Sequence, residues 1–527
     1  MSRARQFIRG VSTTYLQVAV MAICNLWLTP FLLRHVGETD FGGWLILGQL
    51  LIYLELIDFG VTAVLPREIA YATGAATGMD ERASAVSGLL VQARRILWKQ
   101  VPLAIVGAGI VAWLVSRSGR DFELPALAVA AIYVVLYPLR IYPVTLQGLQ
   151  DLGYAGWINL GGWLAGFLTT VVLVYCGFGV WGLVIGWGVF RAFVPLASWI
   201  RFRLGFAWAV PRDGTVRTPA SYELLVRGGW TSVGQIAHSL TNGMEIVLLG
   251  QLLDPAAVIL YVCSSKLVNL FGTNAFTLVL ATEPAVSELH RSAGKARLAE
   301  VLAAVRQLML LTSGLIACVV LVTNEGFVSC WVGESRYGGA TLTVLLVAMT
   351  TLRHLALTVT HGLYCMGYER TLAFVGLCSA AITIAATTAA ILLFGPVGAP
   401  LGLMVGVVLL TLPVYLQMLI RATDSSTWEL FRGHFPWLWR FLGLAGSLVY
   451  ATRYWSPLGY VELFLATIGI CLLYAVVMWS VVRNSSLWRY AGPRLGAVPV
   501  LGGWIARTRL EPPVPDTVNA LNANLIR

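Results

Sequence analysis

The sequence predicts an all-α polytopic membrane protein with 14 transmembrane helices, arranged as two parallel six-helix halves plus two C-terminal helices. Three observations predict it. Long apolar stretches recur along the chain, charged residues are scarce, and most basic residues lie in the segments expected on one side of the membrane. Of the 527 residues 58% are hydrophobic and 12% are charged, and the mean hydropathy is +0.77. Since soluble proteins carry about 25% charged residues, the composition excludes a soluble multidomain enzyme and a disordered scaffold.

Apolar stretches of 18 or more residues are long enough to cross the hydrocarbon core of a membrane as a helix. The first stretch is too long, and is followed too soon by a second, to be a cleaved signal peptide, so we expect an anchor. An even number of helices places both termini on one side. The predicted spans are 8–33, 42–64, 96–115, 125–146, 156–175, 180–200, 224–252, 256–280, 307–328, 340–364, 371–394, 397–420, 437–454 and 459–482.

The basic residues orient these spans. With the N-terminus in the cytoplasm, 27 Lys and Arg residues fall on cytoplasmic segments, five on outer loops and four inside spans. This is a strong positive-inside asymmetry. It also explains the net charge of +11 as cytoplasmic loops that face anionic lipid, without any nucleic-acid partner.

A weak internal repeat divides the chain. It predicts an N-terminal six-helix half (1–218), a C-terminal six-helix half (219–436), two additional transmembrane helices (437–482) and a cytoplasmic tail (483–527). Halves in the same orientation are related by an axis along the membrane normal and enclose a cleft, as in alternating-access transporters. A single-chain channel fits this repeat less well. At an offset of 218 the repeat aligns Arg9-Gly10 with Arg227-Gly228, Thr13 with Thr231, Gln17 with Gln235 and Pro66 with Pro284, and at 219 it aligns Gly148 with Gly367 and Gly179 with Gly398.

Four basic residues lie inside predicted spans. A charge at the centre of a membrane helix costs about 2.5–3.5 kcal/mol on insertion scales, so these residues should face the cleft. Lys266 shares a helix face with Asn269, and either contacts an anionic substrate or pairs with Glu245. The other three either contact substrate or bind helix-end carbonyls of neighbouring helices; they are Arg353, Arg191 and Arg140.

A polar stripe on span 7 includes Gln235, His238 and Glu245 at helical spacing. The repeat places this stripe opposite the face of span 1 that carries Gln17, so these helices are the expected walls of the cleft. Glu245 and His238 are candidates for coupling or gating. For Glu245, transport of a coupling H⁺ and an ion pair that never titrates are equal alternatives.

Glu55 and Asp58 lie three residues apart and share a face of span 2. Paired carboxylates suit acid–base catalysis, but Asp58 is also two turns from Arg67. A gate or structural role is the better interpretation, in which Asp58 pairs with Arg67 or Arg9 to close the cytoplasmic side.

Metal and cofactor sites are not expected. The eight cysteines form no CxxC, and His354 and His361 lack a third ligand at suitable spacing. Phosphate-loop, HExxH and GxSxG motifs are also missing from the sequence, which excludes an internal ATPase and predicts a protein that is not an enzyme.

Several motifs together resemble the start of the Wzx-type flippases of polysaccharide biosynthesis, which belong to the multidrug/oligosaccharidyl-lipid/polysaccharide exporter superfamily. The resemblance extends over most of the chain, although Gly10 stands where the family often has a polar residue and 483–527 matches nothing familiar. The motifs are Phe7-Ile8-Arg9-Gly10, Thr29-Pro30-Phe31-Leu32-Leu33-Arg34, Leu56-Ile57-Asp58-Phe59-Gly60, and the glycine-rich junction from Gly395 to Gly402.

The resemblance implies a flippase in the bacterial cytoplasmic (inner) membrane that moves an undecaprenyl-pyrophosphate-linked oligosaccharide to the outer leaflet. Coupling to an H⁺ or Na⁺ gradient or to the membrane potential, and partners among polymerases and glycosyltransferases of the same pathway, follow as expectations. Such a substrate needs a wide polar cleft, positive charge for the pyrophosphate and a lateral opening for the lipid. The alternatives are a cation-coupled multidrug antiporter, which needs an acidic cleft, and a membrane-bound glycosyl- or acyltransferase, which needs a long extramembrane loop with catalytic residues.

Overall fold

The computed structural model describes residues 20–75, 78–116, 122–210, 222–280, 282–292, 294–426, 428, 432–485 and 487–488. Within these residues all regular secondary structure is helical. Nine helices in this part of the chain are long and apolar enough to cross a membrane, or ten if one bent pair counts as a span. The all-α multi-pass membrane class is therefore confirmed, whereas the count of fourteen spans stays a prediction.

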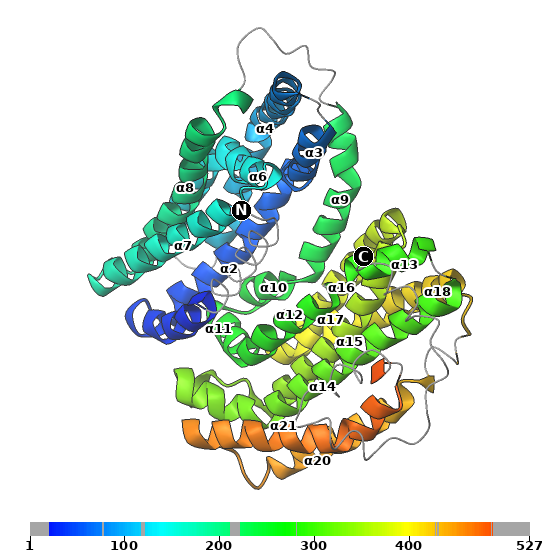
Figure 1. The fold of residues 1–527 in the computed structure, drawn as a ribbon. Coiled ribbons are helices and arrows are strands. Elements are labelled where there is room, and N and C mark those ends of the chain that lie inside the picture. The colour runs from blue at the N-terminus through cyan, green and yellow to red at the C-terminus, as the bar shows by residue number, and fades with distance from the viewer. Residues whose placement is uncertain are drawn as a thin grey trace.

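The N-terminal helices form one group, drawn in blue to cyan in Figure 1. Residues 20–35 are helical and precede this group. Its helices are α2 (Glu38–Leu54), η1 (Glu55–Asp58), α3 (Val61–Ala75), α4 (Met79–Ser116), α5 (Glu123–Leu136), η2 (Tyr137–Arg140), α6 (Ile141–Gly148), α7 (Leu152–Tyr175), α8 (Val180–Gly205) and η3 (Ala207–Ala209).

The second group, green to orange, follows along the chain (Figure 1). It consists of α9 (Tyr222–Thr241), α10 (Met244–Leu252), α11 (Pro255–Ser264), α12 (Lys266–Leu280), α13 (Glu283–Ser292), α14 (Lys295–Val332), η4 (Glu334–Arg336), α15 (Gly339–Cys365), α16 (Glu369–Phe394), η5 (Gly395–Val397), α17 (Gly398–Gly406), the π-helix η6 (Val407–Thr411), α18 (Leu412–Thr423), α20 (Phe435–Ala451) and α21 (Tyr460–Arg483).

Three spans that the sequence predicts as single helices are broken. Predicted span 42–64 ends in η1, and the chain turns where Phe59 and Gly60 adopt positive φ angles of 47° and 72°. Predicted span 224–252 divides at Gly243, whose φ is 98°. Predicted span 256–280 bends by 55° between α11 and α12. Hydropathy does not register these breaks, because the chain stays apolar through them.

Polar groups of neighbouring helices bind the backbone and the side chain of Ser264 at the break between α11 and α12. Asn324 of α14 is fully buried, and its Nδ2 donates to the Ser264 carbonyl at 2.9 Å and to Thr343 Oγ1 at 3.0 Å. The Ser264 hydroxyl in turn accepts from Gly338 N at 2.8 Å. A bend in a membrane helix frees backbone groups that must find partners inside the protein. These contacts satisfy that need and hold the bend against α14 and α15.

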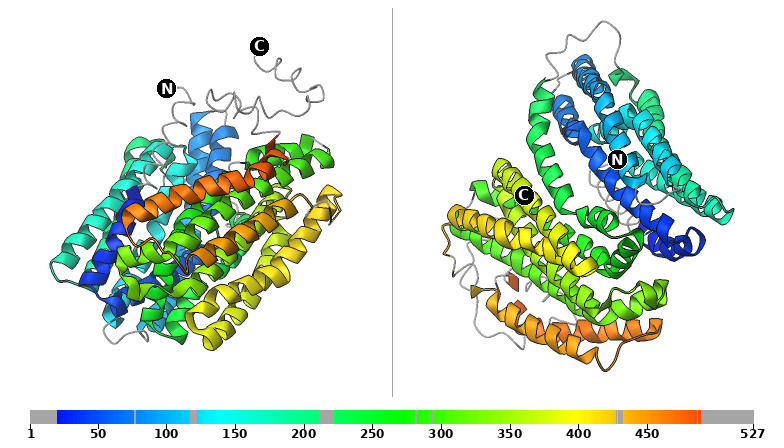
Figure 2. Two further views of the ribbon diagram at one scale, coloured as in Figure 1. Left: turned by 90° about the horizontal axis from the view of Figure 1, so that it is seen from below. Right: turned by 180° about the vertical axis from the view of Figure 1, so that it is seen from behind.

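The two groups meet along α2. That helix packs against α10 and α11, while α9 lies between α3 and α16; the right view of Figure 2 shows α9, in green, between the two groups. Backbone of the two groups comes close together at Gly42, where a Cβ atom would stand 2.5 Å from the Pro255 carbonyl oxygen. At the same end of α2, Glu38 pairs with Arg336 at 2.6 Å. One end of the contact between the groups is thus tightly closed.

The last two helices, α20 and α21, pack against α14 (Figure 2). The Tyr474 hydroxyl donates to the Leu311 carbonyl at 2.8 Å, and Trp437 Nε1 donates to the Tyr474 hydroxyl at 3.2 Å. These contacts attach the two helices to one face of the second group.

Small residues let α16 and α17 pack closely. Gly398, Gly402 and Gly406 lie four apart on one face of α17, and Thr387 and Thr383 face the last two from α16. A Cβ atom at Gly402 would stand 2.2 Å from the Thr387 Cα. Membrane helices commonly associate through such small-residue stripes, because apolar burial supplies little drive in lipid.

We predict that Gly402→Val destabilises the protein by about 3 kcal/mol, since the added atoms meet backbone that has no room to move. The measurement is thermal unfolding of purified protein in detergent. The matched control is Gly469→Val on α21, where a Cβ atom meets nothing within 4 Å. Equal unfolding temperatures for the two variants would contradict the packing argument.

Candidate functional site

A cavity of about 700 Å³ lies between the two groups of helices. Its lining is mixed, with charged and polar side chains set among apolar ones. The lining includes six of the residues that the sequence singles out: Glu55, Asp58, Arg140, Gln235, His238 and Arg353. These come from η1, η2, α9 and α15, so residues far apart in the sequence meet at one place.

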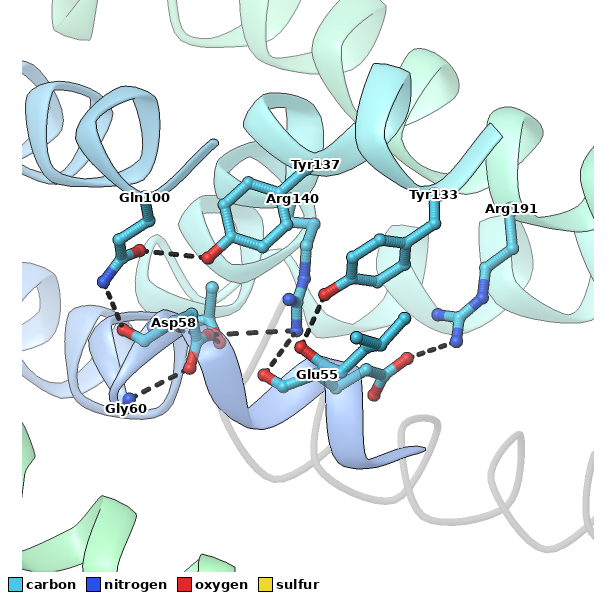
Figure 3. Close-up of polar contacts among 10 residues, drawn as sticks. Glu55, Asp58, Gly60, Gln100, Tyr133, Tyr137, Arg140 and Arg191 are labelled. Carbon is cyan, nitrogen blue, oxygen red and sulfur yellow. Dashed lines mark hydrogen bonds and ion pairs between the residues drawn. The ribbon is translucent and has the colours of Figure 1, made fainter. Parts of the chain in front are cut away.

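The break after α2 explains why polar side chains gather here. Three carbonyls near the end of α2 accept hydrogen bonds from side chains: Leu54 from the Tyr133 hydroxyl at 2.6 Å, Glu55 from Arg140 at 3.4 Å, and Asp58 from Gln100 at 3.2 Å (Figure 3). The chain turns at Phe59 instead of continuing as a helix, which leaves such carbonyls without intrahelical donors.

Asp58 is held from several directions. Only 3% of the residue is exposed. Its carboxylate accepts hydrogen bonds from Gly60 N at 2.9 Å and from the Thr62 hydroxyl, and it lies 3.8 Å from Arg140 Nη2. The pairing of Asp58 with Arg67 that the sequence suggests is therefore wrong, because Arg140 takes that position; Arg9 lies outside the described residues.

Arg191 pairs with Glu55 on the other side of this network (Figure 3). Its guanidinium also lies 5.4 Å from the centre of the Trp187 ring. Arg191 lines a second, smaller cavity of about 230 Å³ within the first group, and this cavity shares Glu55 and Arg140 with the larger one. Of the intramembrane arginines, Arg140 and Arg191 are thus each paired with a carboxylate.

Arg353 differs from these two arginines. It lines the large cavity from the middle of α15, and its guanidinium makes no hydrogen bond or ion pair within the described residues. Glu245 is the carboxylate whose charge acts on it most strongly, but it is not within ion-pair distance. The guanidinium carries its charge at any accessible pH, so Arg353 presents to the cavity a positive charge that no ion pair within the described residues holds.

The remaining sequence candidates lie elsewhere. Lys266 begins α12 at the bend, 5.6 Å from the centre of the Trp331 ring, and neither Lys266 nor Asn269 lines the cavity. The prediction that Lys266 pairs with Glu245 is wrong. The Glu245 carboxylate instead accepts from Gly243 N at 2.9 Å, at the start of α10. Gln17 lies outside the described residues.

The polar stripe of span 7 is interrupted. Gln235 and His238 remain on α9 and line the cavity, whereas the break at Gly243 places Glu245 on α10. Asn242 at this break donates to the His238 carbonyl at 2.6 Å, and its own carbonyl accepts from Gln49 of α2 at 3.4 Å. The break is therefore also a contact between the two groups.

Sequence reasoning missed Tyr133, Tyr137, Gln100 and Thr62. Tyr133 binds the Leu54 carbonyl, and the other three contact the Asp58–Arg140 pair. The Tyr137 hydroxyl donates to Gln100 Oε1 at 3.0 Å, and the centre of the Tyr137 ring lies 5.5 Å from the Arg140 guanidinium. Gln100 was the one detectable signal, since an amide inside an apolar span needs a partner.

Comparisons with known proteins agree with this architecture. Residues 103–335 match the model of a family described as "Polysaccharide biosynthesis protein". The solved structure of lipid II flippase MurJ in an inward closed conformation superposes with a TM-score of 0.63 at 12% identity, covering 90% of this chain and 100% of that one. An inward-facing multidrug resistance MATE family transporter of the MOP superfamily gives 0.54 at 12%, covering 77% and 96%.

This chain has the fold of that superfamily. A third structure, that of the MATE multidrug transporter DinF-BH, agrees with a TM-score of 0.56 at 12% identity, covering 80% of this chain and 95% of that one. The comparison with curated proteins finds no match. The resemblance to polysaccharide-biosynthesis flippases that the sequence motifs carry is therefore confirmed.

We predict that Arg140→Gln destabilises the protein by about 3 kcal/mol, because it leaves the Asp58 carboxylate buried without its cation. The double variant Arg140→Gln/Asp58→Asn should recover part of that loss, since neither charge remains. Thermal unfolding of the two single variants and the double variant forms the measurement. Strictly additive losses would show that the two side chains do not interact.

Proposed function

We propose that this protein flips an undecaprenyl-pyrophosphate-linked oligosaccharide from the cytoplasmic to the outer leaflet of a bacterial inner membrane by alternating access. Arg353 carries the proposal. It is an unpaired guanidinium, among the described residues, in a large and partly polar cavity between two groups of helices, and guanidinium is well suited to bidentate contact with phosphate oxygens. The polar side chains around it suit the glycan, and the pyrophosphate supplies the counter-charge.

In this proposal the chain consists of the two halves 1–218 and 219–436, with α20 and α21 added outside them. The positive-inside distribution places both termini in the cytoplasm. The Glu38–Arg336 ion pair then closes the outer side. Arg336 precedes α15, and the cavity residues Tyr364 and Glu369 lie at and beyond its other end, so the cavity extends toward the cytoplasm.

The Asp58–Arg140 and Arg191–Glu55 pairs support gating in this scheme. They join η1 to η2 and α8 at the wall of the cavity, so a shift of the broken α2–α3 segment must move them. Glu245 and His238 are placed near Arg353, whose charge acts on both. Coupling to an H⁺ or Na⁺ gradient through Glu245 is part of the proposal.

We predict that Arg353→Gln abolishes most transport while the protein still inserts and folds, and that Arg353→Lys retains a fraction. Removing a charge-assisted bidentate contact costs about 2–3 kcal/mol, or roughly a 30- to 160-fold loss of affinity. The assay is flipping of a labelled undecaprenyl-pyrophosphate oligosaccharide in proteoliposomes, read by a membrane-impermeant reagent that modifies only outer-leaflet glycan.

Arg203→Gln is the matched control, because Arg203 is an exposed arginine outside the cavity lining. Wild-type flipping by Arg353→Gln would contradict the assignment of Arg353. Wild-type protein that leaves the glycan lipid in place but exports a cationic dye against an H⁺ or Na⁺ gradient would favour the multidrug antiporter instead.

We also predict that joining Glu38→Cys to Arg336→Cys with a short bifunctional thiol reagent, after replacement of the eight native cysteines, stops flipping. The cross-link holds the outer side closed, and cleavage of a reducible linker should restore activity. Gel mobility after proteolysis between the two positions reports the cross-link. Undiminished flipping by fully cross-linked protein would rule out opening at this end.

A further inference from the structure

A separate pocket of about 410 Å³ lies between the start of α14 and the end of α18; Figure 1 labels both helices in the second group. It lies on a different part of the molecule from the large cavity and shares no lining residue with it. Its polar lining includes Lys295, Arg306, Thr423 and Ser425, set among alanine and leucine side chains.

Arg306 is the unusual member of this lining. Only 5% of the residue is exposed, yet its guanidinium has no hydrogen bond, ion pair or ring contact among the described residues. An arginine cannot shed its charge to relieve burial. A buried charge without a partner is costly, and the described residues around the site include no group that compensates Arg306.

Neighbouring side chains in the described part of the chain do not supply that group. Gln307 Nε2 and both ring nitrogens of His434 are buried without partners. His434 cannot be the counter-ion either, because imidazole is only ever neutral or cationic; burial, and then the charge of Arg306, lowers its pKa to about 4. The carboxylate that lines the pocket, Asp424, pairs with Lys295 at 2.7 Å.

The start of α14 adds to the positive character of the pocket. Its first residue is Lys295. The preceding residue, Gly294, has no side chain that could cap the helix, and the first turn holds no acidic residue. The free N–H groups and the positive end of the helix dipole at such a terminus favour an anion. On the opposite wall, the Thr423 and Ser425 hydroxyls lie 2.9 Å apart and can donate or accept.

We propose that this pocket binds a phosphate ester, with the guanidinium of Arg306 as its anion-binding group. The start of α14 is about 16 Å from Arg306 along the helix (eleven residues at 1.5 Å each) and contributes only to the positive potential of the pocket. The inference does not depend on the proposed flipping activity. It requires only that a phosphate group occupies the space next to Arg306.

The position of the pocket favours a phospholipid headgroup over a soluble phosphate. Helix α14 has 38 residues, about 57 Å at 1.5 Å per residue, against a hydrocarbon core of about 30 Å. Its first turns must therefore extend through the headgroup region. Arg306 lies eleven residues along, near the boundary with the hydrocarbon, and Leu302 and Leu419 supply apolar walls for the start of acyl chains.

The experiment compares thermal unfolding of the full-length protein in a neutral detergent with added phosphatidylglycerol, phosphatidylcholine or inorganic phosphate. Phosphatidylglycerol should raise the unfolding temperature of wild-type protein by roughly 3 °C or more over phosphatidylcholine. Arg306→Gln should lose at least half of that rise. Without added lipid, Arg306→Gln should be as stable as wild type or more so, because it removes an uncompensated charge, which keeps the comparison interpretable.

Arg297→Gln is the matched control, since Arg297 is exposed on the same helix, and it should keep the full rise. A second variant, Lys295→Gln, should reduce the rise less than Arg306→Gln, because Lys295 is already paired with Asp424. An equal rise with inorganic phosphate alone would support the anion site and identify soluble phosphate as its source. An undiminished rise in Arg306→Gln, or no difference between the two lipids, would overturn the proposal.

Discussion

The arginine side chain keeps its charge in every environment that a membrane protein offers, and much of this structure follows from that constraint. Arg140 and Arg191 each pair with a carboxylate from η1, which compensates their charge. Arg353 and Arg306 have no such partner within the described residues, and both line cavities. Paired arginines hold the fold, whereas those without a partner in the described part of the chain are the basis of the two binding proposals.

The carboxylates are where the first two arginines need them because α2 is broken. A continuous helix would satisfy its own carbonyls and would leave no reason for Gln100, Tyr133 and Arg140 to converge on residues 54–58. The left-handed turn at Phe59 and Gly60 frees those carbonyls and fixes Asp58 beside the cavity. The backbone break thus creates both a structural need for polar groups and a polar wall at the place where two groups of helices meet.

The helical class could be predicted from the sequence because apolar length reports directly on membrane crossing. The breaks could not, since Asn242-Gly243 and Ser264-Ser265 interrupt apolar runs without shortening them. Pairing was equally hidden: Asp58 and Arg140 are 82 positions apart, and periodicity describes only neighbours on one element. The sequence therefore predicted Lys266 in the cleft, whereas it lies at the bend beside Trp331, outside the cavity lining.

These pairings change what the excess of basic residues means. Sorted by sequence alone, four intramembrane cations indicate a cleft with positive charge throughout. In the structure two of them are matched by Glu55 and Asp58, and Lys266 lies outside the cavity. Of the four, Arg353 alone is left to present an unpaired charge to the cavity from within the described residues. The proposed preference for an anion therefore rests on one guanidinium rather than on a general field, which fits the proposed substrate, whose pyrophosphate lies between a glycan and a lipid tail.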